Sequence, residues 1–218
     1  MQTSEAQRMR MVAEDLRRRD ISDRRVLAAF AVVPREEFVP AHMVDRAYAD
    51  MPLPIGEGQT ISQPYVVAMT VQALHLEGHE RVLEIGAGSG YAAAILGAIV
   101  KTVHTVERIK ALADTAADRL ARLGFANVHV HHGDGTLGWP PGAPYDAIAV
   151  AAGAPTPPRA LLEQLLIGGR LIVPTGSADD QQLMRITRVD AERFETTNLG
   201  AVRFVPLIGE QGWPSTAR

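Results

Sequence analysis

The N-terminal residues alternate between apolar and polar positions in the way that is typical of amphipathic helices. Apolar residues recur at helical spacing within Ala6–Arg19, so the sequence predicts a helix there. A second helix, capped by Ser22 or Asp23, is expected to run through Val32 and to stop at Pro34. These two helices predict a small helical addition ahead of the rest of the chain.

The following residues, 34–63, carry no regular period. Five breakers interrupt them, namely Pro40, Pro52, Pro54, Gly56 and Gly58. Long loops inside compact domains are usually functional or disordered, and the apolar residues of this segment favour a segment that packs. We therefore expect an irregular but packed segment that ends just before Pro64.

From Pro64 onward, helical and strand periods alternate. Helices are expected at 64–74, 91–100, 109–123 and 159–166, and strands at 81–85, 102–106, 128–132, 146–150, 170–174, 182–189 and 199–205. Strands that alternate with helices predict an α/β fold with a mostly parallel, doubly wound sheet. The last two strands, joined by a short polar segment, predict an antiparallel hairpin at its edge.

Length and charge limit the classes of function. A chain of 218 residues fits one domain, with residues 1–63 as a cap and residues 64–218 as an α/β core. The net charge of −3 gives no general attraction to nucleic acid or to an anionic membrane. The chain has no cysteine, no apolar run of membrane-spanning length, and too many charges near its start for a signal peptide. We expect a cytoplasmic monomer without a nucleic-acid partner.

A glycine-rich turn is the first candidate for binding chemistry. Gly86, Gly88 and Gly90 follow a buried strand and open a helix, in the run Leu83-Glu-Ile-Gly-Ala-Gly-Ser-Gly90. Glycines there let the backbone bend sharply and let a ligand approach the amide groups without a Cβ in the way. The spacing matches neither a phosphate loop nor the full dinucleotide fingerprint. The turn predicts a nucleotide-like cofactor, and a purely structural turn is the alternative.

Three acidic residues refine this prediction. Glu107 ends the next strand, where a carboxylate accepts hydrogen bonds from ribose hydroxyls. Asp134, between Gly133 and Gly135, follows the third strand and is a candidate acceptor for the exocyclic amine of adenine, with an Asp-Gly turn as the alternative. Glu84 directly precedes the glycine turn. A carboxylate there repels a pyrophosphate and tolerates a cation, which favours S-adenosylmethionine over NAD.

The stretch Gly56-Glu-Gly-Gln-Thr-Ile-Ser-Gln-Pro-Tyr65, about twenty residues ahead of the glycine turn, indicates the chemistry. Together with the glycine turn it resembles the protein-L-isoaspartate O-methyltransferases, and the resemblance spans about residues 33–207. Weaker matching pieces lie before and after these two motifs, in the same order along the chain as in the family. They are Pro34–Pro40, Tyr48–Gly56, Asn127-Val128, His132–Gly135, Ala143–Ile148, Gly168-Gly169 and Val202–Leu207.

The resemblance implies a Rossmann-like class I methyltransferase fold whose strand order is altered by the C-terminal hairpin. It implies S-adenosylmethionine as cofactor and, as substrate, the free α-carboxylate of L-isoaspartyl residues in damaged peptides and proteins. The methyl ester then loses methanol to give a succinimide, and hydrolysis returns some normal aspartate. The serine of the Thr-Ile-Ser segment is regarded as the family's active-site residue, which places that role on Ser62.

The expected contacts follow from these motifs. For the cofactor we expect Gln59, Thr60, Ile61, Glu84, Gly86, Gly88, Ser89, Gly90, Glu107, Arg108, Gly133, Asp134 and Gly135. For an extended peptide we expect Tyr65, Val202, Phe204 and Val205, although the last two also suit a core. Two positions depart from the family pattern. Ala87 replaces a common threonine without expected effect, and the segment 151–156 is expected to alter the rim of the substrate site.

The chemistry needs no general base, because a carboxylate acceptor with a pKa of about 4 is already ionised at neutral pH. A bidentate arginine would blunt this nucleophile, whereas the neutral hydroxyl of Ser62 orients it lightly. Capping of the helix at Pro64 is the alternative role of Ser62.

Other functions remain open from sequence. His129 and His131 alternate on one strand with His132 beside them, but no carboxylate completes a set, so no metal site is expected. A methyltransferase of this fold acting on a dedicated peptide or a small-molecule carboxylate is the first alternative. A cofactor-binding regulator without turnover and an NAD-linked oxidoreductase rank below it.

Overall fold

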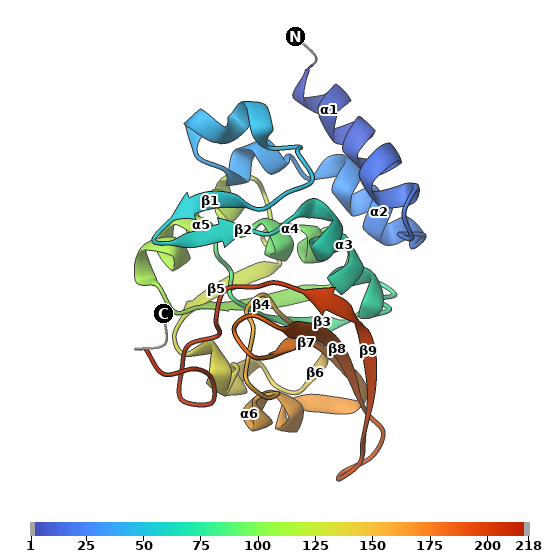
Figure 1. Cartoon of the computed structure of the whole chain (residues 1–218), viewed down its shortest axis with the longest axis vertical. Coiled ribbons are helices and arrows are strands. Elements are labelled where there is room, and N and C mark those ends of the chain that lie inside the picture. Colours follow the sequence, from blue (N-terminus) through green and yellow to red (C-terminus); the bar gives the residue numbers. More distant parts are fainter. Residues whose placement is uncertain (1–2, 216–218) are drawn as a thin grey trace.

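A seven-stranded sheet forms the centre of the protein (Figure 1). The structure is a computed structural model, and it describes residues 3–215. The strand order is β5-β4-β3-β6-β7-β8-β9, with the first five strands parallel and the last two antiparallel. The strands are β3 (Arg81–Ile85), β4 (Thr102–Glu107), β5 (Val128–His132), β6 (Tyr145–Val150), β7 (Leu165–Gly176), β8 (Gln181–Arg188) and β9 (Phe194–Val202). The predicted fold class, including the C-terminal antiparallel hairpin, is confirmed.

Helices cover both faces of this sheet (Figure 1). Three of them, α3 (Pro64–Ala73), α4 (Tyr91–Gly97) and α5 (Lys110–Arg122), lie on one face, and the short α6 (Arg159–Glu163) lies on the other. Pro64 occupies the first turn of α3, as predicted, because a proline lacks the amide proton that this position leaves unpaired. A helix on each face buries the apolar parallel strands from both sides.

The N-terminal cap packs over α3 and α4. Helix α1 (Ser4–Met11) continues as the π-helical segment η1 (Val12–Arg17), and α2 (Arg24–Val32) follows. The carboxylate of Asp23 accepts from the first amides of α2, so of the two predicted caps the structure uses Asp23. Short 3₁₀ helices, η2 (Arg35–Phe38) and η3 (Ala41–Arg46), complete the cap. The cap and the sheet share one continuous hydrophobic core.

The segment before α3 contains a β-hairpin, which corrects the prediction that residues 34–63 are irregular throughout. Strand β1 (Leu53–Gly56) pairs antiparallel with β2 (Gln59–Ile61). Gly56, Glu57 and Gly58 all have positive φ in the connecting turn. The same glycines that read as breakers in the sequence close this turn, because positive φ suits the twist of a tight hairpin. The hairpin places the residues around Ser62 beside the sheet.

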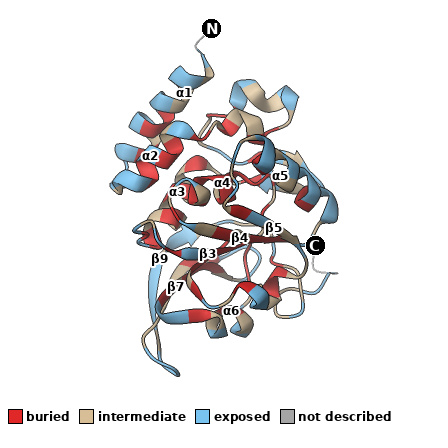
Figure 2. Cartoon of the chain, turned by 180° about the vertical axis from the view of Figure 1, so that it is seen from behind, coloured by how far each residue is buried: buried red, intermediate tan, exposed pale blue. Residues whose placement is uncertain are grey.

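The last strand also differs from its prediction. It runs from Phe194 to Val202, whereas 199–205 was predicted, because its partner β8 turns back through residues 189–193. Phe204 and Val205 therefore follow the strand and belong to the segment that crosses the end of the sheet. Figure 2 shows the buried residues gathered in the central strands and helices, while most of β9 is exposed at the sheet edge.

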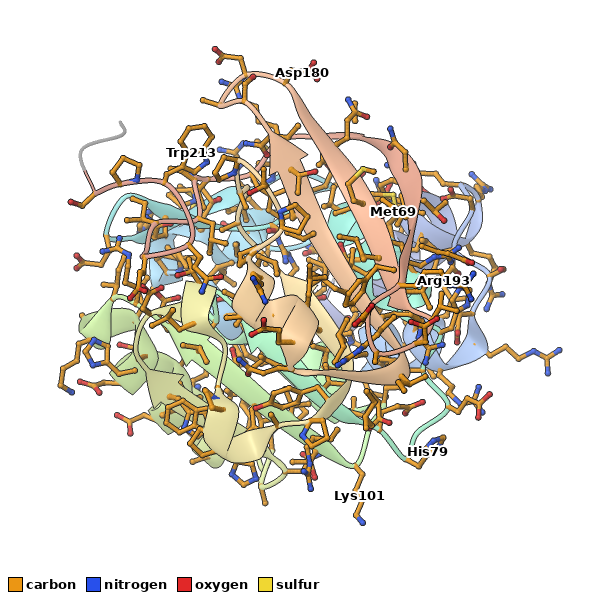
Figure 3. All side chains as sticks on the ribbon, turned by 90° about the horizontal axis from the view of Figure 1, so that it is seen from below. Met69, His79, Lys101, Asp180, Arg193 and Trp213 are labelled. Carbon is orange, nitrogen blue, oxygen red and sulfur yellow. The ribbon has the colours of Figure 1, made fainter. Side chains whose placement is uncertain are left out.

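The two ends of the sheet are distinct. Lys101 and His79 precede β4 and β3, and Figure 3 places them at the end opposite Asp180, in the turn after β7. The carboxyl ends of the parallel strands thus face the same side as this turn and as Trp213. Within residues 3–215, no helix is both long enough and apolar enough to cross a membrane.

Candidate active site

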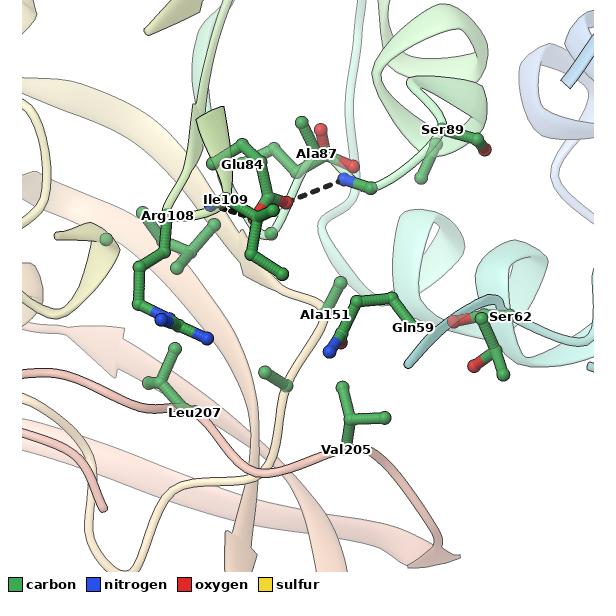
Figure 4. Close-up of a pocket in the computed structure, with 18 of the residues that line it drawn as sticks. Gln59, Ser62, Glu84, Ala87, Ser89, Arg108, Ile109, Ala151, Val205 and Leu207 are labelled. Carbon is green, nitrogen blue, oxygen red and sulfur yellow. Dashed lines mark hydrogen bonds between the residues drawn. The ribbon is translucent and has the colours of Figure 1, made fainter. Parts of the chain in front are cut away.

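A pocket opens at the carboxyl ends of β3, β4 and β6, between three parts of the chain (Figure 4). The sheet edge with the glycine turn forms one wall, the end of the hairpin forms the second, and the segment after β9 forms the third. The predicted residues that line it are Gln59, Thr60, Ile61, Ser62, Glu84, Gly86, Gly88, Ser89, Glu107, Arg108, Gly135 and Val205. Ligands of open α/β sheets bind at this edge.

The glycine turn depends on backbone conformations that side chains disfavour. Gly86, Gly88 and Gly90 all have positive φ, and Gly90 is the residue that caps α4. A Cβ on Gly90 would lie 3.2 Å from a methyl carbon of Leu120 in α5. The turn therefore fits tightly against α5 on one side and leaves its backbone open to the pocket on the other.

Glu107 is held at the end of β4 by two backbone amides. Its Oε2 accepts from the amide of Gly88 and its Oε1 from the amide of Ile109, each at 2.9 Å (Figure 4). Each carboxylate oxygen has a second lone pair for a ligand in the pocket. The geometry suits acceptance from two neighbouring hydroxyls.

Glu84 is buried deeper in the same pocket and is 1% exposed. The hydroxyl of Thr105 donates to its Oε2 at 2.5 Å. Burial raises the pKa of Glu84 to about 8, with a smaller contribution from the charge of Glu107. A cation placed in this pocket favours the ionised form of Glu84, whereas an anion would oppose it.

Ser62 lies between β2 and α3, where the pocket meets a second hollow. Its hydroxyl makes no hydrogen bond within the described residues, and Gln63 is the residue that precedes the first turn of α3. The side chain of Ser62 therefore does not cap α3 in this structure, in contrast to the alternative role considered from the sequence. The carbonyl oxygen of Ser62 is held by Arg35, at 2.8 Å from Nη2.

The second hollow is a groove that leads outward from Ser62. It is lined by Tyr65, Val202, Phe204 and Val205, the four residues predicted to hold a peptide, and by Arg19. The guanidinium carbon of Arg19 lies 3.3 Å from the centre of the Tyr65 ring. Ser62, Thr60, Ala151, Val205 and Pro206 line both the pocket and the groove. The groove thus meets the pocket at Ser62.

Several backbone amides and carbonyls along this groove are already hydrogen-bonded within the protein. The amide and the carbonyl of Phe204 are both paired with the side chain of Gln181, at 2.8 and 3.1 Å. The carbonyl of Val205 accepts from the amide of Gly153 at 2.8 Å. Of the amides and carbonyls of Phe204 and Val205, the amide of Val205 is the one without a hydrogen-bond partner in the described residues. Strand-like pairing with a peptide is therefore limited to few groups.

Three predicted cofactor residues do not line the pocket, namely Gly90, Gly133 and Asp134. The carboxylate of Asp134 accepts from the amide and hydroxyl of Thr136, at 2.9 and 2.7 Å, and from the amide of Glu210 at 2.8 Å. Asp134 thus joins the end of β5 to the segment after β9. One acceptor position of its carboxylate remains for a ligand.

The pocket also contains residues that sequence reasoning missed. They are mainly apolar, namely Val67, Ile85, Ala87, Tyr91, Ala92, Val106, Ile109, Ala151, Ala152, Pro206, Leu207 and Ile208. An apolar lining residue carries no chemical signature of its own, so composition and motif gave no signal. Only Ala87 and the segment around Ala151 had been marked, because they depart from the family pattern.

Two of the three histidines considered from the sequence gather with His104 on one side of β4 and β5, away from the pocket. Nδ1 of His104 lies 3.0 Å from Nε2 of His131, and His131 stacks on Trp139. His104 and His129 have ring centres 5.3 Å apart. Among residues 3–215, no three histidine, cysteine, aspartate or glutamate side chains are placed so that they could hold one metal ion, and this includes these histidines. Burial lowers the pKa of His104 to about 4, with a contribution from His131.

Comparison with known sequences places this site in context. The profile of the family described as protein-L-isoaspartate(D-aspartate) O-methyltransferase matches residues 6–212. A protein-L-isoaspartate O-methyltransferase of Rhodopseudomonas palustris is 59% identical over 97% of this chain and 87% of its own length. Another from Marinobacter nauticus is 56% identical over 95% of each chain.

Solved structures with the same family description superpose on this fold. A protein-L-isoaspartate O-methyltransferase superposes with a TM-score of 0.85 at 29% identity, covering 96% of this chain and 67% of that one. A second, from Plasmodium falciparum, gives a TM-score of 0.80 at 25% identity over 92% of this chain and 98% of its own, and was solved in complex with S-adenosyl-L-homocysteine.

Proposed function

The chain belongs to the protein-L-isoaspartate(D-aspartate) O-methyltransferase family, and from this premise we propose that its methyl-transfer site lies at Ser62. The enzyme uses S-adenosylmethionine to methylate the free α-carboxylate of L-isoaspartyl residues, which starts their repair through a succinimide. The observation that carries the site assignment is that the pocket and the groove share Ser62.

The residues of the pocket fit this cofactor. The paired amide donors on Glu107 leave acceptor positions for ribose hydroxyls, and Glu84 offers a buried carboxylate to a cation. Asp134 does not line the pocket but directly precedes Gly135, which does, and in our assignment its remaining acceptor position serves the cofactor. When bound, S-adenosylmethionine supplies an electrophilic methyl group on a sulfonium sulfur. Gln59, Thr60, Ile61 and Arg108 complete our assignment of the cofactor site on the hairpin and the sheet edge.

The acceptor carboxylate needs orientation and no deprotonation. Its pKa of about 4 leaves it ionised at neutral pH, so a site without a general base is adequate. The unpaired hydroxyl of Ser62 donates one hydrogen bond to this carboxylate in our assignment. Apolar walls at Ala151, Val205 and Leu207 exclude water from the line of attack. Orientation of the two reactants supplies much of the rate.

We assign the groove beyond Ser62 to the peptide that carries the damaged residue. Tyr65 and Phe204 offer aromatic surface on its walls, and Val202 and Val205 add apolar contact. The free amide of Val205 is our candidate for pairing with a peptide carbonyl. In this assignment the peptide is held by apolar and aromatic contacts and by one backbone hydrogen bond.

We further propose that the chain works as one domain and as a monomer in the cytoplasm, without a nucleic-acid partner. The shared hydrophobic core between cap and sheet supports a single domain, since Leu16 and Phe30 of the cap pack in one cluster with Val103 of β4. Light scattering after size-exclusion chromatography measures the mass of the particle in solution. A mass twice that of one chain would contradict the proposed monomer.

Methyl transfer to matched peptides tests the function. One peptide is prepared in its L-isoaspartyl and its ordinary aspartyl form, and each is incubated with S-adenosylmethionine and analysed by mass spectrometry. We expect ester and succinimide only with the isoaspartyl form. Equal transfer to both forms, or no transfer while the cofactor binds, contradicts the function.

Ser62→Ala tests the position of the site. We expect kcat to fall by about ten- to a hundredfold, because the carboxylate loses its orienting donor. The Kd for S-adenosylhomocysteine and the midpoint of thermal unfolding should change little. An unchanged kcat at saturating cofactor and peptide shows that the assignment of Ser62 is wrong.

A further inference from the structure

A buried arginine in the N-terminal cap, Arg35, contacts the backbone of the segment that carries Ser62. Arg35 begins η2 and is 0% exposed, so its guanidinium has no access to water. Its Nε donates to the carbonyl of Ala47 and its Nη2 to the carbonyl of Ser62, both at 2.8 Å. Within the described residues it forms no salt bridge with a carboxylate. Two backbone carbonyls thus accept its hydrogen bonds, and the side chain of Tyr91 is a further polar neighbour.

The same guanidinium also contacts the other half of the site. Its central carbon lies 4.8 Å from the ring centre of Tyr91. Tyr91 is the first residue of α4, directly after the glycine turn, and it lines the cofactor pocket. Phe38, from the end of η2, packs edge-on against this ring at 5.5 Å. Arg35 therefore lies between the start of α4 and the segment that carries Ser62.

Stability alone does not account for a charge in this place. Taking a guanidinium out of water is costly unless it is paired and fully hydrogen-bonded, and Nη1 of Arg35 has no hydrogen-bond partner within residues 3–215. Burial lowers the pKa of Arg35 from its ordinary value. A guanidinium buried at such a cost is expected to provide geometry that an apolar side chain does not provide.

The geometry points to Arg35 as the positioning residue of the acceptor site: by fixing the carbonyl of Ser62, it holds the Ser62 hydroxyl toward the cofactor pocket. This inference rests on the proposed role of Ser62. The planar fork of Arg35 binds two carbonyls, so it sets both the position and the tilt of the Ser62 peptide. An ammonium has no such fixed fork, so lysine is not an equivalent replacement.

Steady-state kinetics of Arg35→Lys and Arg35→Gln test this role. At saturating cofactor and isoaspartyl peptide, we expect kcat to fall by about tenfold in each variant, since small misplacements of reacting groups are costly. The Kd for S-adenosylhomocysteine, measured by calorimetry, should change by less than about twofold. If both variants lose this binding, Arg35 supports the fold in general and the inference is overturned.

A matched control separates this contact from general loosening of the cap. Arg122 pairs with Glu37 of the same η2 segment at 2.8 Å, and both side chains are exposed. Arg122→Gln removes that tether without touching the pocket or the groove. We expect an unchanged kcat. A loss equal to that of Arg35→Lys would mean that any loosening of η2 is enough, which overturns the specific role.

A double-mutant cycle decides whether Arg35 acts through Ser62. In a Ser62→Ala background, Arg35→Lys should lower kcat by less than about twofold, because the group that it positions is already absent. Full additivity overturns the inference and leaves the proposed function intact. Absence of methyl transfer by the wild-type enzyme, with cofactor still bound, removes the proposed function and this inference with it.

Discussion

Two carboxylates face the pocket at the sheet edge, and their surroundings differ. Glu107 is fixed by the amides of Gly88 and Ile109, and its remaining lone pairs suit the ribose hydroxyls that we assign to it. Glu84 has one hydroxyl donor, Thr105, and almost no solvent. Because a buried carboxylate without a counter-charge keeps its proton, Glu84 is mainly neutral in the free enzyme at neutral pH.

Cofactor affinity should therefore depend on pH through Glu84. The positive charge of S-adenosylmethionine favours the ionised carboxylate, so binding below the pKa of about 8 releases a proton. We expect the Kd to tighten as the pH rises from about 6 to about 8, by at most about tenfold per pH unit. Calorimetry in two buffers of different ionisation enthalpy measures both the Kd and the released proton.

The variant Glu84→Gln supplies the control for this prediction. It keeps the shape of the side chain and removes its titration, so the Kd should be weaker and flat over the same pH range. The stability of the free wild-type enzyme should change with pH in the opposite direction to its affinity for the cofactor. Because burial raises the pKa of Glu84 above its unfolded value, stability is lost as the pH rises through about 8. A wild-type Kd that is independent of pH contradicts the assignment.

At the scale of elements, the turn between β3 and α4 depends on glycine for two separate reasons. Gly90 has a φ of 89°, and a Cβ there would also press on Leu120. Gly58 in the hairpin has a φ of 67° with nothing within 4 Å of its missing Cβ. A comparison of alanine substitutions at Gly58 and Gly90 therefore separates the cost of backbone strain from the cost of steric contact.

Gly90→Ala should destabilise the enzyme more than Gly58→Ala. We expect a loss of about 1 kcal/mol in the free energy of unfolding for Gly58→Ala, from left-handed strain alone, and of about 2 kcal/mol or more for Gly90→Ala. Urea unfolding followed by circular dichroism measures both. Equal losses would mean that α5 yields to the added methyl group.

The elements that were predictable from sequence are those whose signal is local. The bounds of β3 at Arg81–Ile85 and β5 at Val128–His132 match the prediction. An apolar run ended by glycine defines β3, and valines that alternate with histidines define β5. The hairpin of β1 and β2 was missed because Pro54 and Gly58 hide a short strand pair. The start of β9 at Phe194 depends on its register with Arg188, which a single segment does not reveal.

At the scale of the whole molecule, the site joins parts of the chain that are far apart in sequence. The hairpin, the sheet edge and the segment after β9 each supply one wall of the pocket. Asp134 connects two of these parts, because it binds Thr136 near the sheet and the amide of Glu210 beyond the last strand. This tie keeps the segment that includes Leu207 and Ile208 against the pocket.

Asp134→Ala should loosen this wall. Loss of charge-assisted hydrogen bonds predicts a decrease of about 2 kcal/mol in the free energy of unfolding. Amide hydrogen exchange should rise in residues 207–213, and the Kd for S-adenosylhomocysteine should weaken. Asp118→Ala is the control, since Asp118 is exposed on α5 and away from the pocket. Unchanged exchange in residues 207–213 would show that Asp134 does not hold the segment.

Long-range contacts explain what sequence reasoning left out of the site. The motif around Ser62 and the glycine turn were visible as patterns, whereas the burial of Arg35 was not. Nothing in Pro34–Pro40 indicates that one arginine points inward to two carbonyls, because those contacts join residues 12 and 27 positions apart. Leu207 belongs to a piece that matches the family, but its place in the pocket wall was not predicted, since that place depends on how β9 ends.

The tie at Asp134 also bears on how the enzyme itself ages. Asp134 is followed by Gly135, and an aspartyl-glycine pair is open to attack by the glycine nitrogen on the side-chain carboxyl carbon. In the fold, the carboxylate of Asp134 is held by Thr136 and Glu210, and Gly135 is buried against Ile85. The contacts that build the pocket wall thus protect the repair enzyme from acquiring, at this position, the lesion that it corrects.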